Sequence, residues 1–213
     1  MRNELDGLIR DYILTHPEIV TEAQKALAER RQRDLVRGNQ AALFEDPGDV
    51  VIGNPKGDVT IVEFFDNECP FCKLFGPTLE KLIAADPKVR VVLKEFAVLG
   101  PGSEIAARYA VASKKQERYL PFHAALLADR TPEHQLAEPH ILEIAASVGL
   151  DTARLKQDAQ APEIQLQLDH ARALGRALGI VGTPGLVVGD SVQSGALTYD
   201  ALQSAVAAAR ARR

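Results

Sequence analysis

VTIVEFFDNECPFC, residues 59–72, runs from a β-branched and aromatic segment into Cys69 and Cys72, which are the only two cysteines among 213 residues. Such a segment is typical of a buried strand. After the cysteines, apolar residues recur at helical spacing, at Leu74, Phe75, Leu79, Leu82 and Ile83. The pattern predicts a strand that turns into a helix at or near Cys69, with Pro77 kinking that helix about one turn beyond Cys72.

The CxxC spacing predicts redox chemistry. Two residues between the sulfurs allow an intramolecular disulfide, and the helix dipole favours a thiolate at the first sulfur. We expect Cys69 to be the exposed nucleophile and Cys72 the shielded resolving thiol. A zinc site would need about two further soft ligands, and the five histidines show no HxxxH or CxxH pattern. A metal-binding pair and an inert structural disulfide remain the alternatives.

A second landmark, GIVGTPGLVVGD, spans residues 179–190. A proline that opens a buried strand cannot donate to the ladder, and a tight turn at Thr183-Pro184 favours a cis peptide bond. The alternative is an ordinary turn before a strand.

Three motifs in order carry a resemblance to a known family. Residues 63–73, residues 94–101 and residues 182–190 together resemble the DsbA-like thiol–disulfide oxidoreductases, and among them the suppressor-of-copper-sensitivity C (ScsC) proteins and their disulfide-isomerase relatives. The resemblance implies an α/β thioredoxin fold with a helical insertion at about 100–160, in which the Thr183 turn faces the CxxC. Clients would then bind at Pro70, Phe71, Thr183 and Pro184, with the Thr183 backbone free to pair with an extended peptide.

Predicted turns divide the chain into an N-terminal helical segment and a catalytic domain. Residues 47–213 are expected to form the DsbA-like domain, because turns at 46–49 and 54–58 bracket its first short strand. Residues 1–46 show two helical patterns and no strand pattern. Leu5, Leu8, Ile9, Tyr12 and Ile13 form one apolar stripe, and residues 15–18 read as a capping box that opens the second helix.

The second helical pattern becomes too polar to pack on a core beyond Leu27. We therefore expect the stripe to pack against copies of itself, and relatives with such an extension form trimers or dimers, so a homotrimer through residues 1–46 is predicted. The alternative is that this segment folds back on its own catalytic domain.

Composition limits the partners and the compartment. A net charge of −4 and a pI near 5.8 give no reason to expect nucleic acid as a partner. No apolar run reaches the ~20 residues of a membrane span, and residues 1–6 lack the apolar core of a secretory signal. Because the chemistry needs an oxidising compartment, we expect a mature periplasmic form.

Glu63 is the one carboxylate inside the strand that precedes the CxxC. It would lie beneath the cysteines and exchange a proton with Cys72 through a water, and burial would raise its pKa. The alternative is a buried ion pair between Glu63 and Lys94. His123 is interpreted as a packing residue.

The function predicted is thiol–disulfide exchange on misfolded or reduced secreted proteins. In the superfamily that the chain resembles, threonine before the proline is common in isomerases and reductases, and an oligomeric N-terminal segment favours the isomerase too. We therefore expect a disulfide isomerase that a membrane thiol reductase keeps reduced. A monomeric DsbA-like oxidase is the first alternative. Copper resistance through Cu(I) held between Cys69 and Cys72 is the second. No cofactor is expected.

Overall fold

The computed structural model describes residues 2–212, with the side chains of residues 2–4 left aside. Its helices are α1 (Arg2–Thr15), α2 (Glu18–Gly38), α3 (Gln40–Phe44), α4 (Pro70–Ala85), α5 (Pro101–Ser113), η1 (Lys114–Gln116), α6 (Tyr119–Ala128), α7 (Glu138–Ser147), α8 (Thr152–Asp158), α9 (Pro162–Ala177) and α10 (Tyr199–Ala211). Its strands are β1 (Val50–Gly53), β2 (Val59–Phe65), β3 (Val89–Glu95), β4 (Gly185–Val188) and β5 (Ser191–Ser194).

The strands form one sheet in the order β1-β3-β2-β4-β5 within the described chain. β2 and β3 are parallel, with α4 as their crossover, and the other pairs are antiparallel. β2 and β3 are buried along almost their whole length, as expected for central strands covered on both faces. The α/β fold predicted from the sequence is confirmed.

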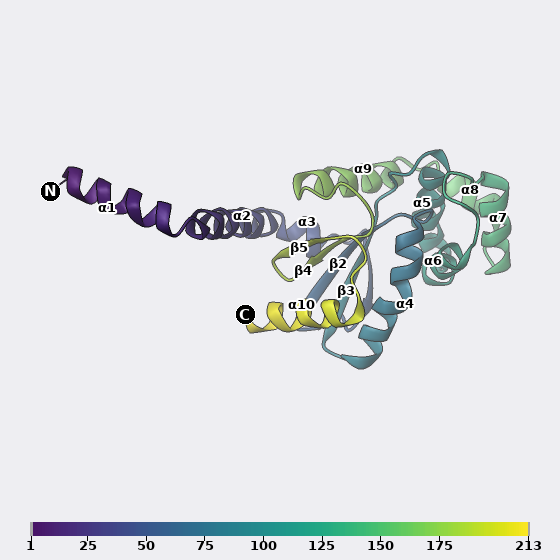
Figure 1. Cartoon of the computed structure of the whole chain (residues 1–213). Coiled ribbons are helices and arrows are strands. Elements are labelled where there is room, and N and C mark those ends of the chain that lie inside the picture. Colours follow the sequence, from purple (N-terminus) through teal and green to yellow (C-terminus); the bar gives the residue numbers. More distant parts are fainter. Residues whose placement is uncertain (1, 213) are drawn as a thin grey trace.

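Helices cover both faces of the sheet (Figure 1). On one face, α4 packs on β3 and α10 packs on β2 and β4, and both share a core with the inserted helices. On the other face, α3, α9 and the end of α2 cover a second core that includes Val62, Phe64 and Val92. The alternation of side chains along β2 separates the two cores.

The helical insertion lies between β3 and β4 and comprises α5 to α8, followed by α9. Figure 1 shows α5 to α8 gathered at one end of the sheet, beyond the start of α4. Their position matches the insertion predicted at about 100–160, and it places α6 directly against α4.

The N-terminal helices form an arm that extends away from the sheet (Figure 1). The predicted stripe on α1 is solvent-exposed in the single chain, so α1 does not fold back on its own catalytic domain. The predicted capping box is wrong: the Thr15 hydroxyl donates to the carbonyl oxygens of Asp11 and Tyr12, at the end of α1. Pro17 precedes the first residue of α2 and already lacks the amide that a cap would satisfy.

The segment that joins the arm to the sheet is docked on the catalytic domain. Val36 and Leu43 are buried in the second core. The ammonium of Lys94, on β3, donates to the Ala42 carbonyl at 2.5 Å and pairs with the Asp49 carboxylate. Residues 36–46 therefore pack as part of the catalytic unit, although the sequence places them in the N-terminal segment. None of the described helices is long and apolar enough to cross a membrane.

Candidate active site

Cys69 lies at the position that begins α4, as the sequence predicts. Cys69 is the N-cap residue, Pro70 is the first helical residue, and the Lys73 amide donates to the Cys69 carbonyl at 3.1 Å. Both cysteines are free thiols. The expected exposure of Cys69 is wrong, because only 3% of the residue is solvent-accessible; Cys72, at 0%, is nevertheless the more shielded.

The turn before β4 accounts for the low exposure of Cys69. β4 pairs with β2 so that Gly185 lies opposite Phe64, which brings the preceding turn to the end of β2 where the cysteines begin. The Thr183-Pro184 peptide bond is cis, and the Cys69 thiol donates to the Thr183 carbonyl at 3.2 Å. A Cβ at position 185 would lie 2.3 Å from Cγ2 of Ile180, so glycine is required there by close packing.

The two cysteines have opposite electrostatic environments. The pKa of Cys69 falls to about 6, because the Cys72 thiol, the Thr183 side chain and the backbone amides of Cys72 and Phe71 stabilise its thiolate, against the effect of burial. The pKa of Cys72 is raised, first by burial and then by its hydrogen bond to Cys69. Near neutral pH the pair therefore holds one thiolate and one thiol.

Glu63 is buried on the α4 face of the sheet, two residues before the end of β2. Burial, and then the nearby charge of Cys69, raises the pKa of its carboxyl to about 8. The predicted alternative, an ion pair with Lys94, is wrong. Glu63 stands opposite Leu93 and Lys94 opposite Phe64, so the two side chains leave opposite faces of the sheet, and Lys94 pairs with Asp49.

Two acidic residues that the sequence analysis did not assign hold the loop before Cys69. Asp66 accepts hydrogen bonds from the amides of Val98 (2.8 Å) and Leu99 (3.1 Å) and from the Ser103 hydroxyl. Glu68 accepts from the amides of Ser103 (3.0 Å) and Leu136 (2.9 Å). These contacts attach the loop before Cys69 to the segment 98–103 and to Leu136. In the sequence, the only hint of this structural role was the presence of two carboxylates just before the CxxC.

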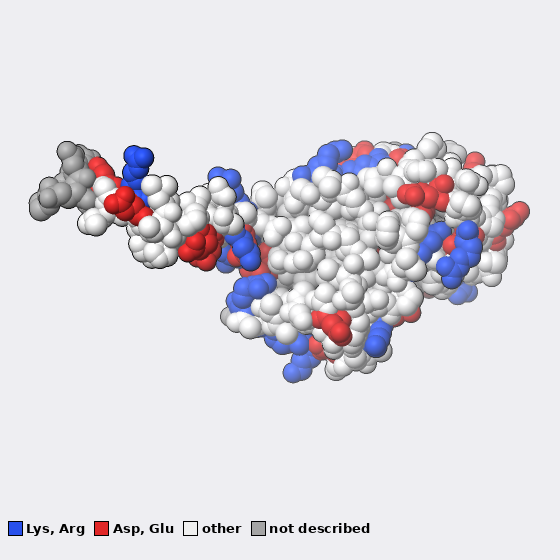
Figure 2. Space-filling model, viewed as in Figure 1, with Lys and Arg blue, Asp and Glu red and all other residues white. Residues whose placement is uncertain are grey.

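Several apolar side chains on the segments that form the site are exposed. Phe71, between the cysteines, is 62% exposed, and Val181, on the loop that leads to the cis bond, is 96% exposed. Leu74 and Val98 are also exposed. Figure 2 shows a broad face of the catalytic domain, between α9 and α10, that carries few charged side chains. No cluster of three or more potential metal ligands occurs among the side chains that the structure describes, those of residues 5–212.

A thiolate at a helix start, a shielded second thiol and a facing cis-proline turn define a thiol–disulfide oxidoreductase with a thioredoxin fold. The chain belongs to the DsbA-like thioredoxin family, whose domain model matches residues 60–207. A second model, that of the copper resistance protein ScsC N-terminal domain, matches residues 2–33. The chain is thus an ScsC-related oxidoreductase with the Cys69–Cys72 pair.

Similar structures cover the catalytic domain alone or the whole chain. A thioredoxin-like oxidoreductase from Silicibacter pomeroyi is 43% identical, with a TM-score of 0.78 over 81% of this chain and 98% of its own. A linker-deletion mutant of Proteus mirabilis ScsC is 30% identical, with a TM-score of 0.78 over 100% of this chain and 96% of its own.

Two curated relatives differ widely in the share of their own length that this chain spans. Disulfide bond formation protein D of Bacillus subtilis is 26% identical over 80% of this chain and 82% of its own length. The chain spans only 28% of the Na(+)/H(+) antiporter NhaA 3 of Salinispora tropica, at 27% identity over 84% of this chain.

Proposed function

We propose that the protein is a periplasmic disulfide isomerase that acts on misfolded or reduced secreted proteins. The observation that carries the proposal is the Cys69 sulfur, whose pKa is lowered to about 6 and which, as a thiol, donates to the Thr183 carbonyl at 3.2 Å. A client strand that pairs with the Thr183 backbone would present its disulfide at that sulfur.

The reaction begins when the Cys69 thiolate attacks one sulfur of a client disulfide. A Cys69–client disulfide forms and the other client sulfur leaves as a thiolate, which can attack a different client disulfide. Attack of a client thiolate on the mixed disulfide returns Cys69 as a thiolate, so no net oxidation occurs. If the mixed disulfide persists, Cys72 attacks Cys69, the reduced client leaves, and a membrane thiol reductase must return two electrons to the pair.

Glu63 serves the Cys72 step in this proposal. Cys72 must lose a proton before it attacks, and its raised pKa makes that loss unfavourable without a base. Glu63 lies close enough for its charge to act on Cys72. A carboxylate with a pKa of about 8 can accept this proton near neutral pH and return it in the reverse direction.

Client binding would use apolar contacts around the sulfur. Pro70 and Phe71 are exposed at the start of α4, and Val181 is exposed on the facing loop beside Thr183 and Pro184. Exposed apolar side chains on both sides of a reactive sulfur suit unfolded clients, which display apolar segments of varied sequence.

The arm favours the isomerase over the oxidase. An ScsC-type N-terminal domain suggests oligomerisation, and the exposed stripe of α1 gives copies of this chain an apolar seam to bury. A homotrimer through residues 1–46 would hold the CxxC pairs around a shared cleft and keep a membrane oxidase from them.

Refolding of scrambled ribonuclease tests the activity. We expect recovery with the reduced wild type and none with Cys69→Ala. Oxidation of reduced ribonuclease without reshuffling would instead support a DsbA-like oxidase, and loss of both activities would leave Cu(I) binding at the two thiolates.

Light scattering on a matched pair of variants tests whether the arm holds the protein in an oligomer. Leu8 lies within the stripe, whereas Leu14 is equally exposed, at 67% for both, on the opposite side of α1. Leu8→Ser should shift the protein towards monomer, and Leu14→Ser should not. A monomeric wild type would remove the argument for the isomerase.

A further inference from the structure

A cavity of about 480 Å³ lies between α4 and α6 and reaches the sheet at Glu63. Its walls are mainly apolar, but they include the ionisable side chains of Glu63, Lys73, Glu80, His123 and Arg130. This volume is ample for several water molecules. The buried carboxyl of Glu63 therefore shares one space with groups that reach the surface.

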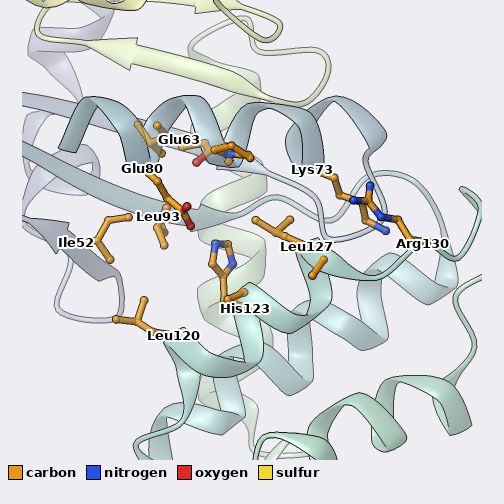
Figure 3. Close-up of a pocket in the computed structure, with 14 residues that line it drawn as sticks. Ile52, Glu63, Lys73, Glu80, Leu93, Leu120, His123, Leu127 and Arg130 are labelled. Carbon is orange, nitrogen blue, oxygen red and sulfur yellow. The ribbon is translucent and has the colours of Figure 1, made fainter. Parts of the chain in front are cut away.

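The ionisable groups occupy two ends of the cavity (Figure 3). His123 points from α6 toward the end of the cavity where Glu80 of α4 and Glu63 of β2 lie, while Lys73 and Arg130 lie at the far end. The Lys73 ammonium is already engaged, because it donates to the Asp129 carbonyl at 2.9 Å. Glu80 is exposed to solvent and Glu63 is buried, so this end runs from solvent to the active-site carboxyl.

His123 is oriented by its neighbours and lacks a polar partner. Its ring packs edge-on against Phe65, with centroids 4.7 Å apart, and stacks on Tyr119 at 5.7 Å. Its Nδ1 is buried without a hydrogen-bond partner in the described chain. An unpaired buried polar atom is unfavourable, and a water in the cavity would satisfy it.

We propose that this cavity is the proton route of the active site, with His123 as the positioning residue that orders water between Glu63 and the exposed carboxylate of Glu80. The inference rests on the proposed role of Glu63. When Cys72 gives its proton to Glu63 and attacks Cys69, Glu63 passes the proton to cavity water and so to bulk solvent. In the reverse reaction a proton from solvent returns to Cys72 by the same route, so protons balance in both directions.

The surroundings of His123 fit a neutral ring in this role. Burial lowers its pKa to about 4, so near neutral pH it has one donor and one acceptor nitrogen, as a water chain needs. Two acids, Glu63 and Glu95, leave the sheet on the same face as Phe65, against which His123 packs. Glu95 is occupied by the Tyr119 hydroxyl at 2.8 Å and the Asn67 amide at 2.8 Å, which leaves Glu63 as the acid served by the cavity.

The test separates the two sulfur steps with glutathione disulfide as the probe. Reduced protein first forms a Cys69–glutathione disulfide, and Cys72 then releases the second glutathione; acid quenching and mass spectrometry follow both steps between pH 5 and pH 9. His123→Phe keeps the ring and removes its nitrogens. Ala124→Leu fills the cavity mouth from an exposed position of α6. The control, Ala208→Leu, makes the same change on the exposed face of α10.

We expect His123→Phe and Ala124→Leu to slow the second step about tenfold at pH 7 and to leave the first step within about twofold. His123→Gln, which keeps hydrogen-bonding groups, should retain most of the second-step rate, and Ala208→Leu should match the wild type. His123→Phe added to Glu63→Gln should slow the second step no further than Glu63→Gln alone, because both act on one route.

Two results would overturn the inference, and they are distinguishable. If Glu63→Gln slows the second step but His123→Phe and Ala124→Leu do not, the cavity is not the proton route while the role of Glu63 stands. If Glu63→Gln itself has the wild-type second-step rate, the proposed role of Glu63 falls, and the route with it. Should His123→Phe fail to fold, Ala124→Leu decides the question.

Discussion

Leu43 offers a measure of how firmly the joining segment is bound to the catalytic domain. Its side chain is 0% exposed and packs in the second core with Val62 and Phe64. Leucine to alanine changes in cores decrease stability by about 2–5 kcal/mol, and more where the site cannot collapse. Collapse is restricted here, because α3 is held by Lys94 at the Ala42 carbonyl (2.5 Å).

We therefore expect Leu43→Ala to lower the free energy of unfolding by about 3–4 kcal/mol, equivalent to roughly 10 °C in Tm for a chain of this size. The control is Leu35→Ala, at a residue that is 45% exposed, where we expect less than about 1 kcal/mol. Since the chain has no tryptophan, urea unfolding is followed by far-ultraviolet circular dichroism on the reduced protein.

Urea unfolding of two truncated chains tests the same docking of the joining segment. Removal of residues 1–33 leaves Val36 and Leu43 in place, whereas removal of residues 1–46 uncovers the second core. Both lack the stripe of α1, so they differ in docking and not in assembly. If Leu43→Ala matches Leu35→Ala, or if the two truncated chains unfold at the same urea concentration, the joining segment is not part of the catalytic unit.

Three further outcomes are expected. Cys72→Ala should move the midpoint of Cys69 alkylation by iodoacetamide from about pH 6 towards higher pH, because the Cys72 thiol is the main cause of the lowered pKa; an unmoved midpoint would assign the shift to the helix amides. The raised pKa of Glu63, about 8, means that the folded chain binds more protons than the unfolded chain between the ordinary carboxyl pKa near 4.5 and pH 8, so its contribution to stability falls as pH rises through this window. Glu63→Gln should remove that fall and stabilise the chain by on the order of 1–3 kcal/mol at pH 7, and urea titrations at pH 5 and pH 8 that shift equally in both proteins would contradict it. Lys94→Met should destabilise the chain by about 3–5 kcal/mol, because it leaves the buried Asp49 carboxylate unpaired, and adding Asp49→Leu should restore most of the loss; no recovery in the double variant would show that the ion pair is not the cause.

Local sequence patterns predicted most of the fold. The strand before Cys69, the helix that begins at Cys69 and the strand that Pro184 opens all formed where period and composition indicated. The pattern failed at residues 15–18, where the Thr15 hydroxyl turned back to α1. The Thr15 hydroxyl can bond either to the carbonyls at the end of α1 or to the amides at the start of α2. The spacing of residues in the sequence does not show which of these hydrogen bonds is more stable.

The sequence likewise identified some residues of the candidate site and missed others. The sequence identified Cys69, Cys72, Thr183 and Pro184, since each belongs to a motif with its own chemistry. It missed the loop contacts of Asp66 and Glu68 because their partners lie about 30 to 70 residues away. It also treated His123 as simple packing, although the ring faces a cavity that only the approach of α6 to α4 creates.

The sequence by itself determined that this protein carries one dithiol at the start of a helix, a proline-opened strand to face it and an apolar stripe on an N-terminal helix. Each of these is a short-range pattern, fixed by neighbours within a few turns of chain. Only the tertiary structure decided that the Cys69 sulfur is buried under the Thr183 turn, that Lys94 pairs with Asp49, and that Glu63 opens on a cavity shared with His123. Those facts depend on which face of the sheet each side chain leaves and on which distant helix packs against it.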